Sequence, residues 1–401
     1  MNNHVIFAAA GNGKTYNICR EAIKLASETN KLVLLITYTH EGVHSLEKEY
    51  RKQNCGVVDK NVVIKTWYIF LLSELIKPYQ CNLKLQSKHY ENELDFIVPE
   101  NYIKSIAFYQ DEEMPRWYKT GHIQYYLNSA RDIRKDSVSS LSIRCIDDSE
   151  NRVIARLEEI YAHIFFDELQ DYAGWDLEIF TRLYASKINI TCVGDYRQAT
   201  FRTNNSAKNK QYRDAKIKDF FVLHKNNGTC ELLYDNTTRR FNAEICDFVN
   251  TIFNDKDSTI YPALDIVHSQ TENIGVYLID NQNMERYCQF YNPTILRYAR
   301  SSKINFAHNC PMFNYGNSKG ATFERVVIVP PGTVLPFIIK QKEITSNQTR
   351  SKFFVACTRA KHSIVFAVDK PKENAFFKPI TIEIGDTTIS AFKYQPCKKD
   401  K

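Results

Sequence analysis

Residues 4–15 of this chain read His-Val-Ile-Phe-Ala-Ala-Ala-Gly-Asn-Gly-Lys-Thr, and this stretch decides the fold. The apolar run from His4 to Ala9 predicts a buried strand, and a helical pattern continues from about residue 16 to residue 29. Gly11 and Gly13 let the backbone curl so that successive N–H groups point inward at a phosphate chain. We therefore expect an α/β fold that begins with a strand, a phosphate-binding loop and a helix.

The side chains of this loop indicate a bound nucleotide. Lys14 is placed to reach the β- and γ-phosphates, and the Thr15 hydroxyl is placed to ligate Mg²⁺. The usual signature opens with Gly where this chain has Ala8, and a Gly-rich turn without a ligand is the alternative for the loop taken alone. The predicted nucleotide-binding residues are Ala10, Gly11, Asn12, Gly13, Lys14 and Thr15.

Two further polar segments follow apolar strands. The strand at 161–166 ends in Asp167 and Glu168, where one carboxylate suits Mg²⁺ and the next suits deprotonating an attacking water. The strand at 188–193 precedes Gln198, whose amide can hydrogen-bond both a γ-phosphate and that water. Ligands of parallel sheets bind beyond the carboxyl ends of the strands. Together the three segments predict nucleotide hydrolysis, whereas an isolated Asp-Glu pair or Gly-Asp turn would indicate a solvated loop.

In their order and spacing these segments resemble the UvrD/Rep/PcrA type of superfamily 1 DNA helicase, over roughly residues 5–368. The resemblance implies two RecA-like parallel-sheet lobes, ATP and Mg²⁺ as cofactors, and single-stranded or partly duplex DNA as a partner. Residues 37–40, 66–70 and 198–202 resemble the family's Thr-Phe-Thr-Asn, Thr-x-His-x-Phe and Gln-Ser-Ile-Tyr-x-Phe-Arg segments. With the Ser-Lys-Gly segment at 318–320, they imply DNA contacts at Thr37, Thr39, His40, Thr66, Trp67, Phe201, Arg202 and Lys319.

The second half of the chain carries two arginines that match the family. Arg240 lies in the place of the arginine in Asn-Tyr-Arg-Ser, and residues 355–361 resemble Val-Ala-Leu-Thr-Arg-Ala-Lys, with Arg359 as the arginine. A guanidinium binds phosphate oxygens through two hydrogen bonds, so arginines from a different lobe than Lys14 would close the lobes when a γ-phosphate is present. A surface basic pair is the alternative for Arg239 and Arg240 taken alone. The resemblance implies four catalytic residues, Glu168, Gln198, Arg240 and Arg359.

The chain departs from the family pattern at several positions. Thr322 stands where the family has a glutamate that contacts ribose, and His40 and Tyr68 replace an asparagine and a histidine. The family's glutamine segment for adenine has no counterpart before the first strand, so the preference for ATP rests on the resemblance.

Composition limits the class of protein. The chain has 401 residues, 43% of them hydrophobic, and a net charge of +7, which fits roughly two or three domains and a nucleic-acid partner. Its 11 cysteines are scattered singly, without the spacing of zinc or iron–sulfur ligands, and they indicate a reducing cytoplasm. No apolar run of about 18 residues or more occurs, so no membrane span is expected.

The motifs divide the chain into a first lobe at 1–228 and a second lobe at 229–401. The first lobe contains a small, mostly helical insert at about 71–150, in the position of the family's 1B subdomain. Aromatic and basic residues interleave in this insert, which suits single-strand binding, although a core role for the aromatics is an equal alternative. These residues are Arg116, Trp117, Tyr118, Lys119, Tyr125, Tyr126, Arg131, Arg134 and Lys135.

A dense basic stretch follows the Phe201 segment, near the predicted exit of the strand, and a solvated basic face is its alternative. Its members are Lys208, Lys210, Arg213, Lys216 and Lys218. The second lobe has predicted strands at 275–279, 294–298, 326–329 and 363–368. Because these strands need most of the interval between Arg240 and Lys319, the family's 2B insertion is expected to be absent or vestigial.

These features predict an ATP- and Mg²⁺-dependent single-stranded DNA translocase or helicase, with 3′–5′ polarity implied by the resemblance. The alternative is a DNA-sensing ATPase subunit that regulates a partner nuclease, because compact UvrD-like proteins accompany a nuclease in bacterial anti-phage systems such as Gabija. An RNA-directed motor is a third possibility.

Overall fold

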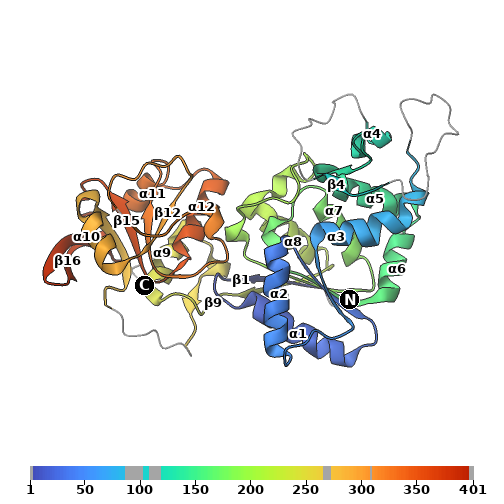
Figure 1. The fold of residues 1–401 in the computed structure, drawn as a ribbon, viewed down its shortest axis with the longest axis horizontal. Coiled ribbons are helices and arrows are strands. Elements are labelled where there is room, and N and C mark those ends of the chain that lie inside the picture. The colour runs from blue at the N-terminus through green and yellow to red at the C-terminus, as the bar shows by residue number, and fades with distance from the viewer. Residues whose placement is uncertain (1–2, 86–102, 108–118, 265–271, 308, 397–401) are drawn as a thin grey trace. The chain divides into compact units, whose positions relative to one another are not determined.

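The computed structural model describes residues 3–85, 103–107, 119–264, 272–307 and 309–396. The chain forms two compact units (Figure 1). Unit 1 comprises Met1–Ile6, Lys14–Gly194 and Arg202–Leu233, and unit 2 comprises Phe7–Gly13, Asp195–Phe201 and Tyr234–Lys401. Two short segments of the first half, the loop before Lys14 and the turn after Gly194, therefore group with unit 2. The lobe boundary between 228 and 229 stays a prediction.

A six-stranded sheet in the order β3-β2-β6-β7-β1-β8 organises the N-terminal part of the chain. β2 pairs in parallel with β3 and with β6, and β6 pairs in parallel with β7. β2 and β6 are buried almost throughout, which explains why their sequences are continuous apolar runs rather than alternating ones. The strands are β1 (His4–Ala8), β2 (Leu32–Thr37), β3 (Val62–Thr66), β6 (Tyr161–Phe166), β7 (Asn189–Gly194) and β8 (Glu231–Asp235).

Helices connect the strands of this sheet, because parallel neighbours need a crossover. α1 begins at Lys14, directly after the phosphate loop, as the helical pattern predicts. A π-helix, η1 (Leu71–Ile76), and a 3-10 helix, η2 (Lys77–Asn82), extend α3. The α-helices are α1 (Lys14–Glu28), α2 (His40–Gln53), α3 (Trp67–Phe70), α5 (Val138–Asp148), α6 (Arg152–Ile160), α7 (Asp176–Tyr184) and α8 (Ile217–Asn226).

The described part of the 71–150 insert is made of short elements. Besides η1, η2 and α5 it holds α4 (Ile123–Tyr126) and a parallel pair of two-residue strands, β4 (Ile106–Ala107) and β5 (Ile133–Arg134). Tyr126 is buried, and its hydroxyl donates to the Thr120 carbonyl (2.9 Å), so this aromatic is a core residue. Arg116, Trp117 and Tyr118 lie outside the described residues.

Unit 2 is built on a seven-stranded sheet in the order β13-β12-β14-β15-β11-β17-β16. The four predicted strands are confirmed as β11, β12, β14 and β15, and together with β13 they pair in parallel. β17 pairs antiparallel with β11 and with β16. The strands are β11 (Gly275–Asp280), β12 (Thr294–Arg297), β13 (Met312–Asn314), β14 (Phe323–Val329), β15 (Ala360–Val368), β16 (Phe377–Ile384) and β17 (Thr387–Tyr394).

Alternate residues of the central strands fill two cores on opposite faces of this sheet. Val326 and Ile328 join the core that α9 (Ala243–Phe253), α11 (Leu335–Lys340) and α12 (Asn347–Cys357) cover. Val327 joins the other core, with residues of α10 (Asn281–Tyr291) and of the β16–β17 hairpin. β9 (Thr237–Thr238) precedes α9 and β10 (Tyr261–Pro262) follows it, and the two short strands pair in parallel.

The α/β fold class with parallel strands is confirmed, but the antiparallel hairpin at the edge of the second sheet was not predicted. Its signal is present in the sequence, since Ile380, Ile382 and Ile384 alternate with polar residues before Gly385, which has a φ of 55°. In the described part of the chain, no helix is long and apolar enough to cross a membrane.

Candidate nucleotide and nucleic-acid site

The turn after β6 lies next to the start of α1. Thr15 Oγ1 is 3.4 Å from Asp167 Oδ2, and the backbone N–H of Glu168 donates to Asp167 Oδ1 (2.9 Å). Glu168 has a φ of 56°, a left-handed conformation that is uncommon for a residue with a side chain. Such conformations cluster at functional sites. The structure therefore brings together the predicted metal-binding pair and places the predicted base at a strained position beside it.

Gln170 is a residue of this turn to which sequence reasoning assigned no role. Its Nε2 donates to Glu168 Oε2, and its side chain is buried. A Cβ built on Gly194, at the end of β7, would lie 2.5 Å from Gln170 Oε1 and 2.7 Å from Leu169 Cβ, so the close packing requires glycine there. Gln170 therefore lies between β7 and the carboxylate of Glu168. In the sequence, its position two residues after Glu168 was the signal that could have indicated this role.

The phosphate loop is fastened to the segment that follows β8. Thr238 Oγ1 donates to the Ala10 carbonyl (2.7 Å), and Arg239 N donates to the Gly11 carbonyl (2.9 Å). Gly11 has a φ of 76°, and a Cβ there would clash with the Cβ of Arg240. Gly11 is thus required both by its backbone conformation and by its contact with an arginine predicted to be catalytic.

The side chain of Asn12 also bonds the phosphate loop to the segment that follows β8. Its Nδ2 donates to the carbonyl and the hydroxyl of Thr237, both at 3.1 Å. Gly13, with a φ of 93°, completes the loop, and the next two residues open α1. Ala10, Gly11, Asn12 and Gly13 belong to unit 2, whereas Lys14 and Thr15 belong to unit 1, and the Gly13–Lys14 peptide bond joins the two groups.

Three of the four predicted catalytic residues lie together in unit 2. Arg359 is 1% exposed, and its Nη2 donates to Gln198 Oε1 (2.8 Å). Arg359 Nε also donates to the Val355 carbonyl (2.9 Å), one turn earlier in α12. Arg240 Nη1 donates to the Thr358 carbonyl (3.0 Å), next to Arg359 in the chain. Glu168, the fourth predicted catalytic residue, belongs to unit 1.

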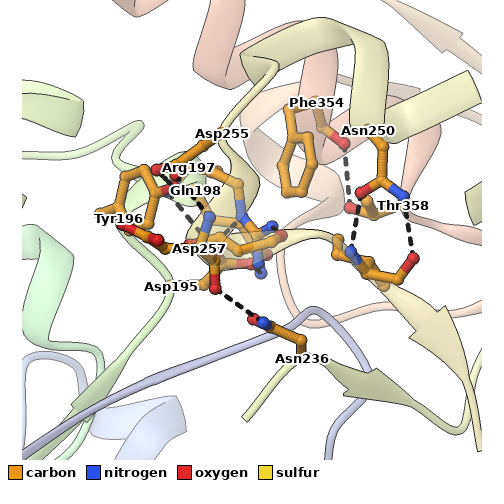
Figure 2. Close-up of polar contacts among 12 residues, drawn as sticks. Asp195, Tyr196, Arg197, Gln198, Asn236, Asn250, Asp255, Asp257, Phe354 and Thr358 are labelled. Carbon is orange, nitrogen blue, oxygen red and sulfur yellow. Dashed lines mark hydrogen bonds and ion pairs between the residues drawn. The ribbon is translucent and has the colours of Figure 1, made fainter. Parts of the chain in front are cut away.

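The turn after β7 is fixed by a buried acid (Figure 2). Asp195 Oδ2 accepts from Gln198 Nε2 (2.9 Å), and Asp195 Oδ1 accepts from Arg197 Nε (2.7 Å). The Tyr196 hydroxyl donates to Asp255 Oδ2 (2.5 Å), and burial raises the pKa of Tyr196, so the phenol stays protonated. Arg197 and Tyr196 were not singled out from the sequence, where they are two unremarked positions between Asp195 and Gln198.

The predicted DNA-contacting threonines of unit 1 differ in exposure. Thr39 and His40 are exposed at the start of α2, where Thr39 Oγ1 accepts from the backbone N–H of Gly42 (2.9 Å). Thr66 Oγ1 accepts from the Ile69 N–H (3.3 Å) at the start of α3 and is buried, as is Thr37. Helix capping accounts for the hydroxyls of Thr39 and Thr66.

The prediction that Trp67 contacts DNA is wrong, because the side chain has 0% exposure. Its Nε1 donates to Asp176 Oδ1 (3.0 Å), and its ring stacks on Phe180 with centroids 6.1 Å apart. Asp176 is fully buried and also accepts from the hydroxyls of Ser139 and Thr203. Burial raises the pKa of Asp176, while these hydrogen bonds act in the opposite direction. Trp67 is therefore part of the core of unit 1.

Phe201 and Lys319 form a surface pair in unit 2. Phe201 is 45% exposed, and Lys319 Nζ lies 5.8 Å from the centroid of its ring, a cation–π distance. Arg202, by contrast, donates from Nε and Nη2 to the two carboxylate oxygens of Asp214, at 2.9 and 2.8 Å. This bidentate pair engages the guanidinium that was predicted to contact DNA.

Two cations of the basic stretch after Phe201 have partners within the protein. Lys208 Nζ lies 3.3 Å from Glu178 Oε1 and 5.2 Å from the ring centroid of Trp175. Arg213 Nη2 donates to the carbonyl of Ser206 (2.7 Å). Lys208 and Arg213 are thus engaged within the protein, and whether the stretch contacts DNA stays a prediction.

The residues near the phosphate loop fit Mg²⁺ rather than a metal held by protein ligands alone. Among the residues that the structure describes, no group of three or more His, Cys, Asp or Glu side chains could hold a metal ion. Magnesium prefers oxygen ligands and usually keeps waters and phosphate oxygens, which suits the Thr15 hydroxyl and the Asp167 carboxylate. Cys19, in α1, is no competing ligand, because burial above all raises the pKa of its thiol to about 12.

The viral superfamily 1 RNA helicase core domain matches residues 117–368, more than half of the chain, so the chain is of the superfamily 1 helicase class. The UvrD/REP helicase N-terminal domain matches residues 1–220, more than half of the chain, and the chain belongs to this family. No curated protein gives a significant match in sequence.

Solved structures similar to the chain include viral helicases. The Arterivirus nonstructural protein 10 helicase is 11% identical, with a TM-score of 0.44, and the match covers 91% of this chain and 59% of that one. Its complex with DNA is 12% identical, with a TM-score of 0.43 and coverages of 92% and 61%. The PRRSV helicase is 15% identical, with a TM-score of 0.40 and coverages of 97% and 59%. The chain thus spans about three fifths of the length of these solved chains.

Proposed function

We propose that the chain is a Mg²⁺-dependent ATPase of the UvrD/REP helicase family that moves along single-stranded DNA. The observation that carries the proposal is the approach of Thr15 Oγ1 to Asp167 Oδ2, at 3.4 Å, beside Glu168. A hydroxyl and a carboxylate at this spacing suit a Mg²⁺ ion that is also bound to nucleotide phosphates.

The residues of unit 1 would carry the first part of the chemistry. Lys14 would neutralise the β- and γ-phosphates, and Thr15 and Asp167 would hold the metal. When bound, Mg²⁺ neutralises charge that develops on the phosphate oxygens. Glu168 takes a proton from the attacking water, and the hydrogen bond from Gln170 orients its carboxylate for that transfer.

The residues of unit 2 would carry the second part. The Gln198 amide orients the attacking water, and the guanidinium groups of Arg359 and Arg240 stabilise charge on the transferred phosphoryl group. The hydrogen bond between Arg359 and Gln198 supports this assignment, because it places a cation and a water-orienting amide 2.8 Å apart. ATP is proposed as the nucleotide from family membership.

Steady-state ATP hydrolysis by the purified chain, with and without single-stranded DNA, tests the proposal. We expect DNA to stimulate turnover, and we expect Lys14→Ala to abolish it, because the phosphates lose their main counter-charge. Lys24→Ala is the matched control, since Lys24 lies in the same helix with a side chain that is 73% exposed and forms only a 4.0 Å surface pair with Glu28. Turnover by Lys14→Ala equal to that of the control would refute the nucleotide site.

Single-stranded DNA is proposed to stack on Phe201, with Lys319 beside it. An exposed aromatic ring flanked by a cation suits a base and its phosphate. Phe201→Ala should weaken DNA binding about 5- to 150-fold, which corresponds to roughly 1–3 kcal/mol per stacked base. Phe290→Ala is the control, since Phe290 is an equally exposed aromatic of unit 2, 51% against 45%. Tailed duplexes with a 3′ or a 5′ single strand test the 3′–5′ polarity, and RNA in place of DNA tests the choice of nucleic acid.

A second candidate function is a DNA-sensing ATPase that regulates a partner nuclease. It is favoured by the interval between Arg240 and Lys319, whose described residues form α9 to β13 of unit 2 itself and no separate domain. Strand separation would then depend on a partner. Unwinding of a tailed duplex by the isolated chain would count against this candidate, and co-purification with a nuclease would support it.

The cysteines of the described residues are free thiols, which supports a cytoplasmic location.

A further inference from the structure

Arg197 is a buried arginine beside the proposed site. It is 4% exposed, and arginine is rarely this buried unless it is paired. Its Nε donates to Asp195 Oδ1 (2.7 Å), and its Nη1 donates to the carbonyl of Ser258 (2.7 Å). The guanidinium thus spans from the turn after β7 to the 3-10 helix η8 (Lys256–Ser258), 61 residues further along the chain.

Asp195 transmits the position of Arg197 to Gln198. One carboxylate accepts from both side chains: Oδ1 accepts from Arg197 Nε, and Oδ2 accepts from Gln198 Nε2 (2.9 Å). Because a carboxylate is rigid and planar, a shift of the guanidinium would rotate Oδ2 away from the amide. The orientation of Gln198 therefore depends on a residue next to it in sequence that points to a different element.

The same guanidinium contacts the helix that carries Arg359. Arg197 Cζ lies 5.1 Å from the ring centroid of Phe354, in the last turns of α12. The Phe354 carbonyl accepts from the backbone N–H of Thr358 (3.0 Å), and the next carbonyl, that of Val355, accepts from Arg359 Nε. Arg197 therefore packs on the helical turn from which Arg359 reaches Gln198.

Tyr196 anchors the turn independently. Its hydroxyl donates to Asp255 Oδ2 (2.5 Å), and its ring meets Phe253 edge-on, with centroids 6.2 Å apart. Asp255 Oδ1 accepts from the N–H of Asp257 (3.1 Å) and so begins the short helix that ends at Ser258. Two neighbouring residues of the turn, Tyr196 and Arg197, thus hold one element at two points.

We propose that Arg197 is a positioning residue: by holding Asp195 on one side and Phe354 on the other, it keeps the Gln198 amide and the Arg359 guanidinium paired at 2.8 Å. This inference rests on the proposed function, in which that pair acts on the γ-phosphate. Arg197 acts through its neighbours, since its Nε and Nη1 donate to Asp195 and Ser258.

The test compares Arg197→Gln with Arg325→Gln, alone and combined with Gln198→Ala. Arg325 is a matched buried arginine of unit 2, 8% exposed, which donates to the Asn273 carbonyl (3.0 Å) and lies 4.5 Å from the ring centroid of Tyr291. Arg197→Gln should lower kcat for ATP about 10- to 100-fold, as small misplacements of catalytic groups do, with KM changed by less than about twofold. In the Gln198→Ala background it should add little, because the amide it positions is gone, whereas Arg325→Gln should act independently.

Effects of Arg197→Gln and Gln198→Ala that multiply would overturn the inference, and they would leave the ATPase proposal intact. A wild-type chain without ATPase activity would refute the proposed function instead, and amide hydrogen exchange then decides the inference. Exchange at 355–359 should be faster in Arg197→Gln than in Arg325→Gln, and equal exchange in the two variants would overturn it. If Arg197→Gln does not fold, Arg197→Lys, which keeps the charge but loses the planar guanidinium, should change kcat and the same amides in the same direction, and no change there would overturn the inference.

Discussion

The turns that follow β6 and β7 end neighbouring strands of one sheet, but they are held in different ways. In the turn after β6, Asp167 and Gln170 bond to Glu168, one and two residues away. In the turn after β7, Gln198 bonds both to Asp195, three residues away, and to Arg359, 161 residues away. These bonds to Glu168 come from its own turn, whereas the orientation of Gln198 also depends on a residue far along the chain.

The largest effect is expected when Arg359, the distant partner of Gln198, is replaced. Arg359→Ala should lower kcat about a thousandfold or more, because an arginine that stabilises phosphoryl-transfer charge contributes about 10³–10⁵. Steady-state ATP hydrolysis measures the effect, with Arg325→Ala as the buried control. A loss of kcat no larger than that of the control would show that the function of the second turn does not depend on Arg359.

The next largest effect is expected at one position of the first turn. Glu168→Gln should lower kcat about 10²- to 10⁴-fold, because the amide cannot accept a proton from water. Binding of ATP should persist, since charge on the phosphates is handled by other residues. Single-turnover hydrolysis and nucleotide binding, with Glu178→Gln in α7 as the control, provide the measurement, and undiminished turnover would contradict the assignment.

The strands beneath both turns share a buried histidine. His163 Nε2 of β6 lies 2.9 Å from Thr191 Oγ1 of β7, and burial, aided by His4, lowers the pKa of His163 to about 4. Between this value and the ordinary pKa of about 6.5, the unfolded chain binds a proton that the folded chain does not. The contribution of His163 to the free energy of unfolding should therefore fall by about 3 kcal/mol as the pH drops from 7 to 4.

Denaturant unfolding across this pH range measures the effect of His163. His163→Gln removes the titrating group, so its stability should depend less steeply on pH in the same window. If the two chains lost stability in parallel between pH 6.5 and 4, His163 would not be the group responsible.

The smallest expected effect lies where β7 packs on the first turn. Gly194→Ala should cost about 1–3 kcal/mol of stability, because the added methyl meets Leu169 and Gln170 in a packed region. Its kcat should fall as well, since Gln170 holds Glu168. Gly121→Ala is the control, because a Cβ there meets nothing within 4 Å. Thermal unfolding and ATP hydrolysis are measured on both variants. Equal stability and kcat in the two would show that the turn after β6 does not need a glycine at position 194.

The sequence predicts the strands and the first turn well for a physical reason. Strands buried on both faces are continuous apolar runs, and residues such as Asp167 and Glu168 follow them directly. Trp67 was placed wrongly because its partner, Asp176, is 109 residues away, and nothing beside Thr66 shows whether an indole faces a core or a ligand. Arg197 was overlooked for the same reason, since a carbonyl and an aromatic ring far along the chain decide its role.

The sheet order also has a consequence for synthesis of the chain. β1, at the N-terminus, lies between β7 and β8, so neither of its neighbours has been translated when it leaves the ribosome. At about 5–20 residues per second, β1 precedes β7 by roughly 10–40 s, with β8 following later. The nascent chain therefore carries an apolar strand without its sheet. The phosphate loop that follows lacks its hydrogen bonds to the segment after β8. The sheet around β1 is therefore complete only after β8 has been translated.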